Sequence, residues 1–192
     1  MADLSPNSDI VREFMIAAHG NLPRVKEMLA KEPGLLNAPY AWREDDLETG
    51  IQAAAHVGNT PIAEFLLDEG APLAICTAAM LGRLDTVKAL ISQEPNRVNE
   101  HGAHKITLLA HAAISGNVSL LELLAGHGVQ EGASHALGEA VNHRREEAAR
   151  WLLDNARPDL SWTDFQGRTP LQIAETQGFD EITSLLNAHA GS

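Results

Sequence analysis

Cysteine, aromatic and basic residues are all scarce in this sequence. The single cysteine, Cys76, excludes an internal disulfide and fits a reducing compartment, where we expect it to be a small buried residue. Aromatic residues make up 4% of the chain, which favours many thin helical layers over one thick core. There are 14 Lys and Arg against 26 Asp and Glu, a formal charge of −12. A field of that sign repels phosphate backbones and anionic membrane surfaces, so neither nucleic acid nor a membrane is expected as a partner.

Long apolar runs and catalytic motifs are missing as well. No apolar stretch approaches the roughly 20 residues that span a bilayer, and the N-terminus lacks the basic and apolar segments of a signal peptide. We therefore expect a soluble, cytoplasmic protein. The sequence also has no Gly-rich phosphate loop, no nucleophile elbow and no Cys/His set with enzyme spacing. We predict no catalytic residue, no cofactor and no enzymatic activity.

Residues 164–186 have the pattern of a turn followed by two short helices. Thr169 is placed to cap the first helix, Pro170 occupies its first position, and Gly178 ends it. The apolar residues of the second helix recur at helical spacing, at Ile182, Leu185 and Leu186. Each helix has only one apolar face, so a neighbouring unit must cover it. Further copies of this unit are therefore expected.

The helix-ending position recurs along the chain, and a pair of small or apolar residues precedes it each time. The six residues at this position are Gly20, Gly58, Gly82, Gly116, Arg144 and Gly178. An apolar pair follows eight or nine residues later, as at Leu66-Leu67 and Leu152-Leu153. The small pairs allow helices to stack closely, and the apolar pairs supply the inner face of each second helix. Together these spacings indicate an irregular helical repeat.

The last copy, Asp164-x-x-Gly167-x-Thr169-Pro170-Leu171-x-x-Ala174 followed by Gly178, resembles an ankyrin repeat, whose period is about 33 residues. The resemblance covers six copies, at residues 8–36, 37–70, 71–97, 98–129, 130–158 and 159–189. It implies an all-α solenoid of stacked helix-turn-helix pairs with short hairpin fingers, forming a single domain over residues 1–192. The short, eroded array is similar to bacterial ankyrin proteins. We expect full-length hairpins on copies two, four and six only.

Arg144 departs from this pattern, because glycine normally occupies a helix-ending position with left-handed backbone. If Arg144 adopts that conformation, it does so at a cost of about 1 kcal/mol; the alternative is that the turn is made differently, at His143. Replacing it with glycine is therefore predicted to raise the unfolding midpoint.

In ankyrin proteins, partners are held by the hairpin tips and by the two residues before the helix-ending glycine. The resemblance therefore implies a protein-binding surface with tip residues Trp42, Arg43, Glu44, Asp46, His101, His104, Phe165 and Gln166, and helix residues His19, His56 and His143. Trp42 and Phe165 are candidate aromatic anchors; the alternative is that each packs against the neighbouring hairpin. Trp162, in the segment leading to a tip, is expected to be buried. We predict that the chain is a monomer that binds another protein.

The histidines leave a second class of function open. His101-x-x-His104 could ligate zinc with His111, but nothing in the spacing makes the three converge. The alternative is that His104 and His111 bond to loop backbone and hold neighbouring hairpins together. We favour the latter and predict no metal. The competing hypothesis for the whole protein is a small-ligand or metal pocket in the groove around His56, His101, His104 and Glu48.

Glu48 itself has two possible roles. It could cap the helix that starts at Thr49, where a carboxylate is stabilised by the helix dipole. Alternatively, Asp46 and Glu48 could form a polar pocket with His56. We favour capping.

Overall fold

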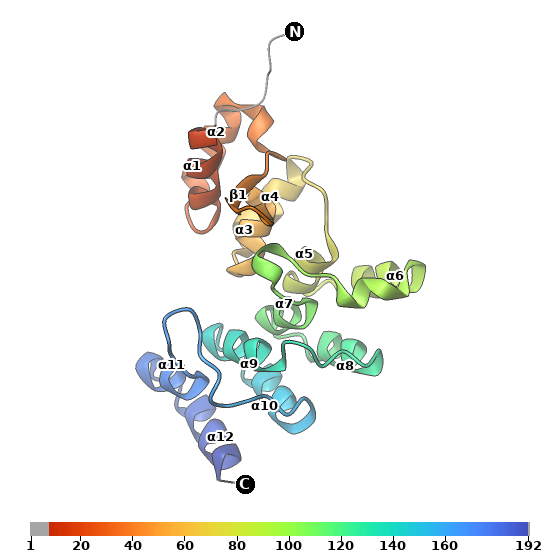
Figure 1. The fold of residues 1–192 in the computed structure, drawn as a ribbon, viewed down its shortest axis with the longest axis vertical. Coiled ribbons are helices and arrows are strands. Elements are labelled where there is room, and N and C mark those ends of the chain that lie inside the picture. Colours follow the sequence, from red (N-terminus) through yellow and green to blue (C-terminus); the bar gives the residue numbers. More distant parts are fainter. Residues whose placement is uncertain (1–7, 192) are drawn as a thin grey trace.

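The computed structural model describes residues 8–191, which fold into twelve α-helices in six consecutive pairs (Figure 1). The pairs are α1 (Ser8–Ala18) and α2 (Leu22–Lys31), α3 (Gly50–His56) and α4 (Thr60–Asp68), α5 (Ile75–Met80) and α6 (Leu84–Gln93), α7 (Leu108–Ser115) and α8 (Val118–Gly126), α9 (Ala133–Asn142) and α10 (Glu146–Asn155), and α11 (Pro170–Gln177) and α12 (Asp180–Ala190). Short 3-10 helices occur at η1 (Pro33–Leu35), η2 (Pro95–Asn99) and η3 (Ala103–Lys105). The expected all-α stack is confirmed.

The first helices of the pairs form one continuous row, in which α1, α3, α5, α7, α9 and α11 each contact the next. Their small side chains are fully buried, as at Ala54, Ala78, Ala112 and Ala140, which allows the backbones to approach closely. The second helices lie on one side of this row (Figure 1). The apolar core falls into two clusters, one centred on the first two pairs and the other running from α5 to α12. Cys76 is buried as expected, and burial raises the pKa of its thiol to about 12.

The helix ends follow the predicted chemistry. Thr169 caps α11 through a capping box with Gln172, and Pro170 is the first residue of that helix. Gly178 ends α11 with a φ of 68°, and Arg144 has a φ of 53°, so both adopt the expected left-handed backbone. Within residues 8–191, every helix is too short or too polar to cross a membrane.

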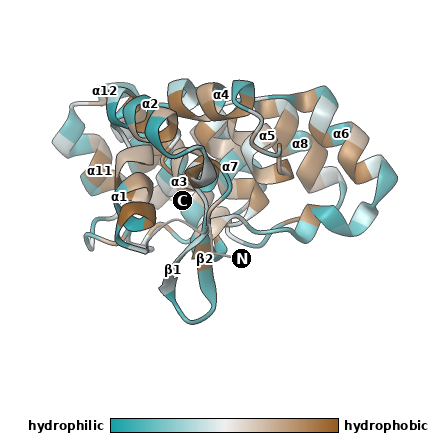
Figure 2. Cartoon of the chain, turned by 90° about the horizontal axis from the view of Figure 1, so that it is seen from above, coloured by the Kyte–Doolittle hydropathy of each residue, from teal (hydrophilic) through white to brown (hydrophobic). Residues whose placement is uncertain are grey.

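The fingers differ from the prediction of three full-length hairpins. Within the described residues 8–191, only residues 40–48 form paired strands, β1 (Tyr40–Arg43) and β2 (Asp46–Glu48), and this hairpin projects from one edge of the stack (Figure 2). The fourth pair begins with a single bridge between His101 and Thr107 around η3. The sixth begins with a turn in which the Asp164 carboxylate accepts the backbone N–H groups of Gln166 and Arg168. Local turn hydrogen bonds therefore replace strand pairing in these two fingers.

Candidate functional site

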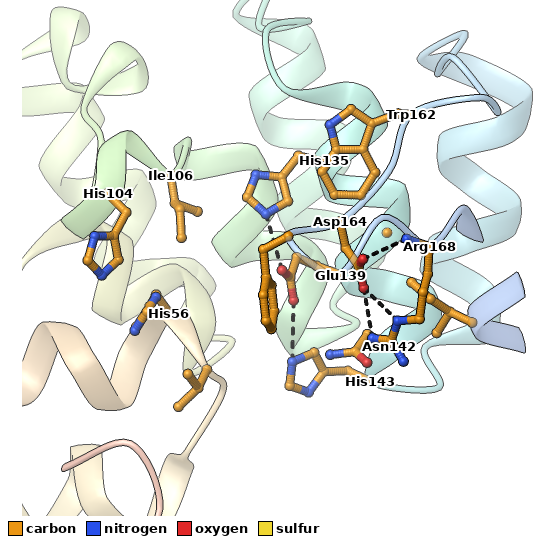
Figure 3. A pocket seen from close by; sticks show the side chains of 14 residues that line it. His56, His104, Ile106, His135, Glu139, Asn142, His143, Trp162, Asp164 and Arg168 are labelled. Carbon is orange, nitrogen blue, oxygen red and sulfur yellow. Dashed lines mark hydrogen bonds and ion pairs between the residues drawn. The ribbon is translucent and has the colours of Figure 1, made fainter. Parts of the chain in front are cut away.

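A pocket with a volume of about 500 Å³ lies between the fingers and the ends of the first helices (Figure 3). Elements far apart in the sequence build it: the end of α3, the η3 finger, α9 and the turn before α11. Its lining residues are His56, Val57, His104, Ile106, His135, Gly138, Glu139, Asn142, His143, Trp162, Asp164, Phe165, Arg168 and Ile173.

Two aromatic side chains form one wall of the pocket. The Trp162 ring stacks on His135, with the ring centres 5.2 Å apart and the planes inclined by 23°. It also lies over Gly138, where an added Cβ would meet the indole at 2.5 Å, so glycine makes room for the ring. Trp162 is half-buried and lines the pocket, which corrects the expectation of burial. Phe165 is 93% exposed at the tip of the adjacent turn, as predicted for an aromatic on a tip.

The carboxylate of Glu139 lies between two imidazoles, and all three side chains line the pocket. Glu139 Oε1 lies 3.1 Å from His135 Nε2, and Glu139 Oε2 lies 3.5 Å from His143 Nε2 (Figure 3). Burial by itself would raise the pKa of Glu139, but hydrogen bonds from His135 and His143 outweigh it and lower that pKa to about 2. The groove therefore holds a fixed negative charge at neutral pH.

The turn that carries Phe165 is held in place by an ion pair. Arg168 donates from Nε and Nη2 to Asp164 Oδ2, at 2.9 and 2.7 Å. A fork of this kind fixes direction as well as distance. Burial would raise the pKa of Asp164, but hydrogen bonds from Arg168 and Gln166 lower it below the ordinary value. The turn thus presents Phe165 on a rigid support.

A second polar cluster lies beside the pocket, around the fully buried side chain of Glu48. Its Oε2 accepts a 2.6 Å hydrogen bond from Trp42 Nε1. Its Oε1 lies 3.2 Å from His56 Nε2 and 3.3 Å from His104 Nε2, yet no contact to this oxygen has hydrogen-bond geometry. His19 joins the cluster, with 2.9 Å between its Nε2 and that of His56.

The η3 finger packs against the β1–β2 hairpin through charged contacts. His104 donates its backbone N–H to Asp46 Oδ1 at 3.0 Å, and its Nδ1 lies 2.7 Å from Asp46 Oδ2. Lys105 Nζ lies 2.8 Å from Asp45 Oδ2. The bond from His104 lowers the pKa of Asp46. His104 therefore holds neighbouring fingers together, which is the role that we favoured for it over zinc binding.

A model of the ankyrin repeat family, described as ankyrin repeats in three copies, matches residues 52–135 and again residues 75–164, together more than half of the sequence. The chain belongs to the ankyrin repeat family. As a member of it, the chain is a non-enzymatic binding protein. Which partner it binds is decided by its own surface residues, because one repeat scaffold supports many functions.

Three curated proteins resemble this ankyrin repeat protein. Cyclin-dependent kinase 4 inhibitor B of Rattus norvegicus is 29% identical over 133 residues, covering 66% of this chain and 99% of that protein. The protein of the same name from Mus musculus is 29% identical over 124 residues, covering 61% and 92%. Cyclin-dependent kinase inhibitor 2A of Homo sapiens is 29% identical over 124 residues, covering 61% and 77%.

The zinc trio that we weighed and did not favour, His101, His104 and His111, does not converge in the structure. His101 Nε2 lies 3.7 Å from Glu131 Oε1. Both residues line a second pocket, separate from the one that His104 lines. His111 is buried, and its Nδ1 lies 2.9 Å from the carbonyl oxygen of Thr107. Burial lowers the pKa of His111 to about 4.

The other predicted residues divide into two groups. Arg43, Glu44 and Gln166 are exposed on the fingers. Trp42 is half-buried, with the Tyr40 ring at 4.9 Å and its N–H bonded to Glu48, so it packs into its own hairpin. The preference for Glu48 as a helix cap is wrong, because Thr49 and Gln52 form the capping box and Glu48 points inward.

Two polar residues of the pocket, His135 and Glu139, were missed at the sequence level, whereas His143 was predicted. The three follow one another at intervals of four residues, so they lie on one face of a helix and could have been recognised as a polar stripe. Asp164 and Arg168 are also four apart, but only the closed turn brings their charges into contact.

Proposed function

We propose that this ankyrin repeat protein is a recognition module that holds a segment of another protein in its groove. The observation that supports this most is Phe165, which is 93% exposed on a braced turn beside Trp162 and a pocket of about 500 Å³. The Phe165 ring leaves a large apolar surface in water, and aromatic anchors of this kind dominate protein interfaces when a partner covers them. The pocket beside it offers room for a large side chain of the partner.

The chemistry of the groove indicates what that segment carries. Apolar contact comes from Trp162, Phe165 and Ile106, while Glu139 supplies a negative charge with a pKa of about 2. Arg168 is already paired with Asp164 and offers little free positive charge. A segment with an apolar side chain next to a Lys or Arg fits this arrangement, and the chain's charge of −12 favours its approach.

The contact surface that we propose extends from the groove onto the fingers. It includes Arg43, Glu44 and Gln166, which are exposed, and Trp42, Asp46, His19, His56, His101, His104 and His143 at its edges. We further infer that the six helix pairs are six ankyrin repeats forming one domain, and that the protein works as a monomer in the cytoplasm. Light scattering should give a monomer mass that is independent of concentration; a mass that rises with concentration would contradict this.

The relatives are named as inhibitors of cyclin-dependent kinases. We propose a cyclin-dependent kinase as the first defined protein to test as a partner. Fold similarity at 29% identity does not transfer the target by itself, so the groove variants below decide the matter.

The test is binding of a purified partner to the wild-type chain and to two variants, measured by calorimetry. Phe165→Ala is expected to weaken binding at least about 10-fold, the loss typical of an aromatic anchor. Ile16→Ala is the matched control, because Ile16 is also an exposed large apolar residue, at 50%, but lies on α1 outside the pocket. Equal binding by wild type and both variants would refute the groove as the binding surface, whichever protein is used.

A further inference from the structure

Ligand-type atoms of His19, Glu48 and His56 converge beside the groove, and one atom of His104 lies next to Glu48, so that three separate repeats contribute. His19 Nε2, at the end of the first pair, lies 2.9 Å from His56 Nε2, at the end of α3. Glu48 Oε1, at the end of β2, lies 3.2 Å from His56 Nε2. His104 Nε2, from the η3 finger, lies 3.3 Å from the same oxygen. One atom from each of His19, Glu48 and His56 lies within 4.8 Å of the others.

The separations of 2.9 and 3.2 Å within the trio of His19, Glu48 and His56 are those of neighbouring ligand positions in a tetrahedral metal site, and His104 Nε2 lies 3.3 Å from one member of the trio. Zinc binds imidazole nitrogen and carboxylate oxygen at about 2.0–2.2 Å, which places neighbouring ligand atoms of a tetrahedron about 3.3 Å apart. Hydrogen-bonded pairs have similar lengths, so distance alone does not distinguish a metal site from a hydrogen-bonded cluster. The positions of the ring protons on the histidines do distinguish them.

The cluster has too few protons to satisfy its own lone pairs. His19 Nδ1 lies 2.7 Å from the carbonyl oxygen of Met15, so this nitrogen carries the ring proton and Nε2 presents a lone pair. His104 Nδ1 lies 2.7 Å from Asp46 Oδ2, which assigns its proton in the same way. Glu48 Oε1 is a fully buried acceptor that no donor satisfies. His56 Nε2 can offer at most one proton to this group of acceptors, and a cation at the centre would satisfy all of them.

The surrounding contacts are those that orient metal ligands. A ligating histidine typically donates its other ring N–H to a backbone carbonyl or a carboxylate, and a ligating carboxylate is itself hydrogen-bonded. His19 meets the first condition through Met15, and His104 meets it through Asp46. Glu48 meets the second through Trp42, whose N–H holds Oε2 and leaves Oε1 facing the imidazoles. The carboxylates of Glu48 and Asp46 together balance the charge of a divalent ion.

We propose that His19, Glu48 and His56 bind a divalent transition metal of the zinc class, with His104 in the fourth position. Such an ion joins the end of the first repeat to the second and to the finger of the fourth. Because contacts in a repeat array are mostly between neighbours, a link of this kind adds a direct connection between the first repeat and the finger of the fourth. The site shares His19, His56 and His104 with the edge of the proposed contact surface, but it requires nothing of Phe165 or Glu139, so the two proposals are tested by different variants.

The experiment is calorimetric titration of the full chain, stripped with a chelator and dialysed, with zinc chloride. We expect one zinc per chain and a higher thermal midpoint with zinc. Cobalt should give the visible absorption of a tetrahedral nitrogen and oxygen site. His19→Ala and His56→Ala should each weaken zinc binding at least about 10-fold. His101→Ala is the matched control, because that imidazole is also exposed on the η3 finger but faces Glu131.

Circular dichroism shows whether each variant is folded. His19 is half-buried at the end of α1, so His19→Ala keeps the test decisive if His56→Ala does not fold. The proposal is overturned if millimolar zinc gives no binding and no thermal shift. It is also overturned if His19→Ala binds as tightly as wild type, or if binding is lost instead in a His135→Ala variant, which would place the metal at the Glu139 cluster.

Discussion

The left-handed residue Arg144 allows the cost of one backbone conformation to be measured. Its φ is 53°, at the position where Gly178 has a φ of 68° in the next repeat. A side chain in this conformation costs about 1 kcal/mol. The structure adds an opposing contribution, because the Arg144 guanidinium lies 5.3 Å from the centre of the Phe179 ring. A cation–π contact at an exposed site contributes about 0.5–1 kcal/mol.

Two substitutions separate these contributions. Arg144→Ala removes the cation–π contact and keeps the strained backbone, so it should lower the free energy of unfolding by about 0.5–1 kcal/mol. Arg144→Gly removes both, so it should be about 1 kcal/mol more stable than the alanine variant and slightly more stable than wild type. Arg157 is the matched control: its φ is 48°, and no ring within residues 8–191 stacks on it. Arg157→Gly should therefore gain the full 1 kcal/mol, approximately.

The assay is urea unfolding followed by circular dichroism, with thermal melts as a second measurement. For a chain of this size, about 1 kcal/mol corresponds to a shift of about 2–4 °C in the midpoint. An alanine variant as stable as the glycine variant would refute the reasoning, because it would show that the left-handed backbone costs nothing here. A glycine variant clearly below wild type would show that the contact with Phe179 outweighs the strain.

Three further predictions concern stability. Gly58→Ala should cost about 1–3 kcal/mol more than Gly178→Ala, because both have positive φ but only the first would place a Cβ within 2.7 Å of neighbouring side chains; equal urea midpoints would contradict this. Glu48→Ala, in chelator, should cost about 1–3 kcal/mol by leaving a tryptophan N–H without its acceptor, whereas Glu44→Ala, at an exposed position, should melt like wild type. His111 has a pKa lowered to about 4 by burial, so the unfolded chain binds its proton first and stability falls as the pH drops from 6.5 to 4; this slope should become shallower in His111→Gln, and an unchanged slope would show that other groups cause it.

The scaffold could be read from the sequence because its determinants are local. Thr169, Pro170 and Gly178 define a helix by capping, fixed φ and left-handed backbone, and each acts on the few residues beside it. The same logic predicted the strained φ of Arg144. Phe165 could also be placed at a tip, since its turn is set by neighbouring residues.

The site needed distances that no local pattern contains. His101 and His104 are three residues apart, but the left-handed backbone of His104 turns it toward Asp46, while His101 faces Glu131. His56 contacts His19, which lies 37 residues away along the chain, so no local sequence pattern predicts this contact. The burial of the Glu48 side chain was not predicted either, because we expected Glu48 to cap the helix. In the structure Thr49 and Gln52 form the capping box instead.

The sequence by itself determined the repeating helix pairs, the positions of their ends and the scarcity of positive charge, since these depend on residue type and on neighbours within one turn. Tertiary structure decided the shape of the groove and the convergence of His19, Glu48 and His56. The reason is that stacking brings the ends of successive repeats within a few ångströms of one another, and their side chains then meet at distances set by packing rather than by spacing along the chain.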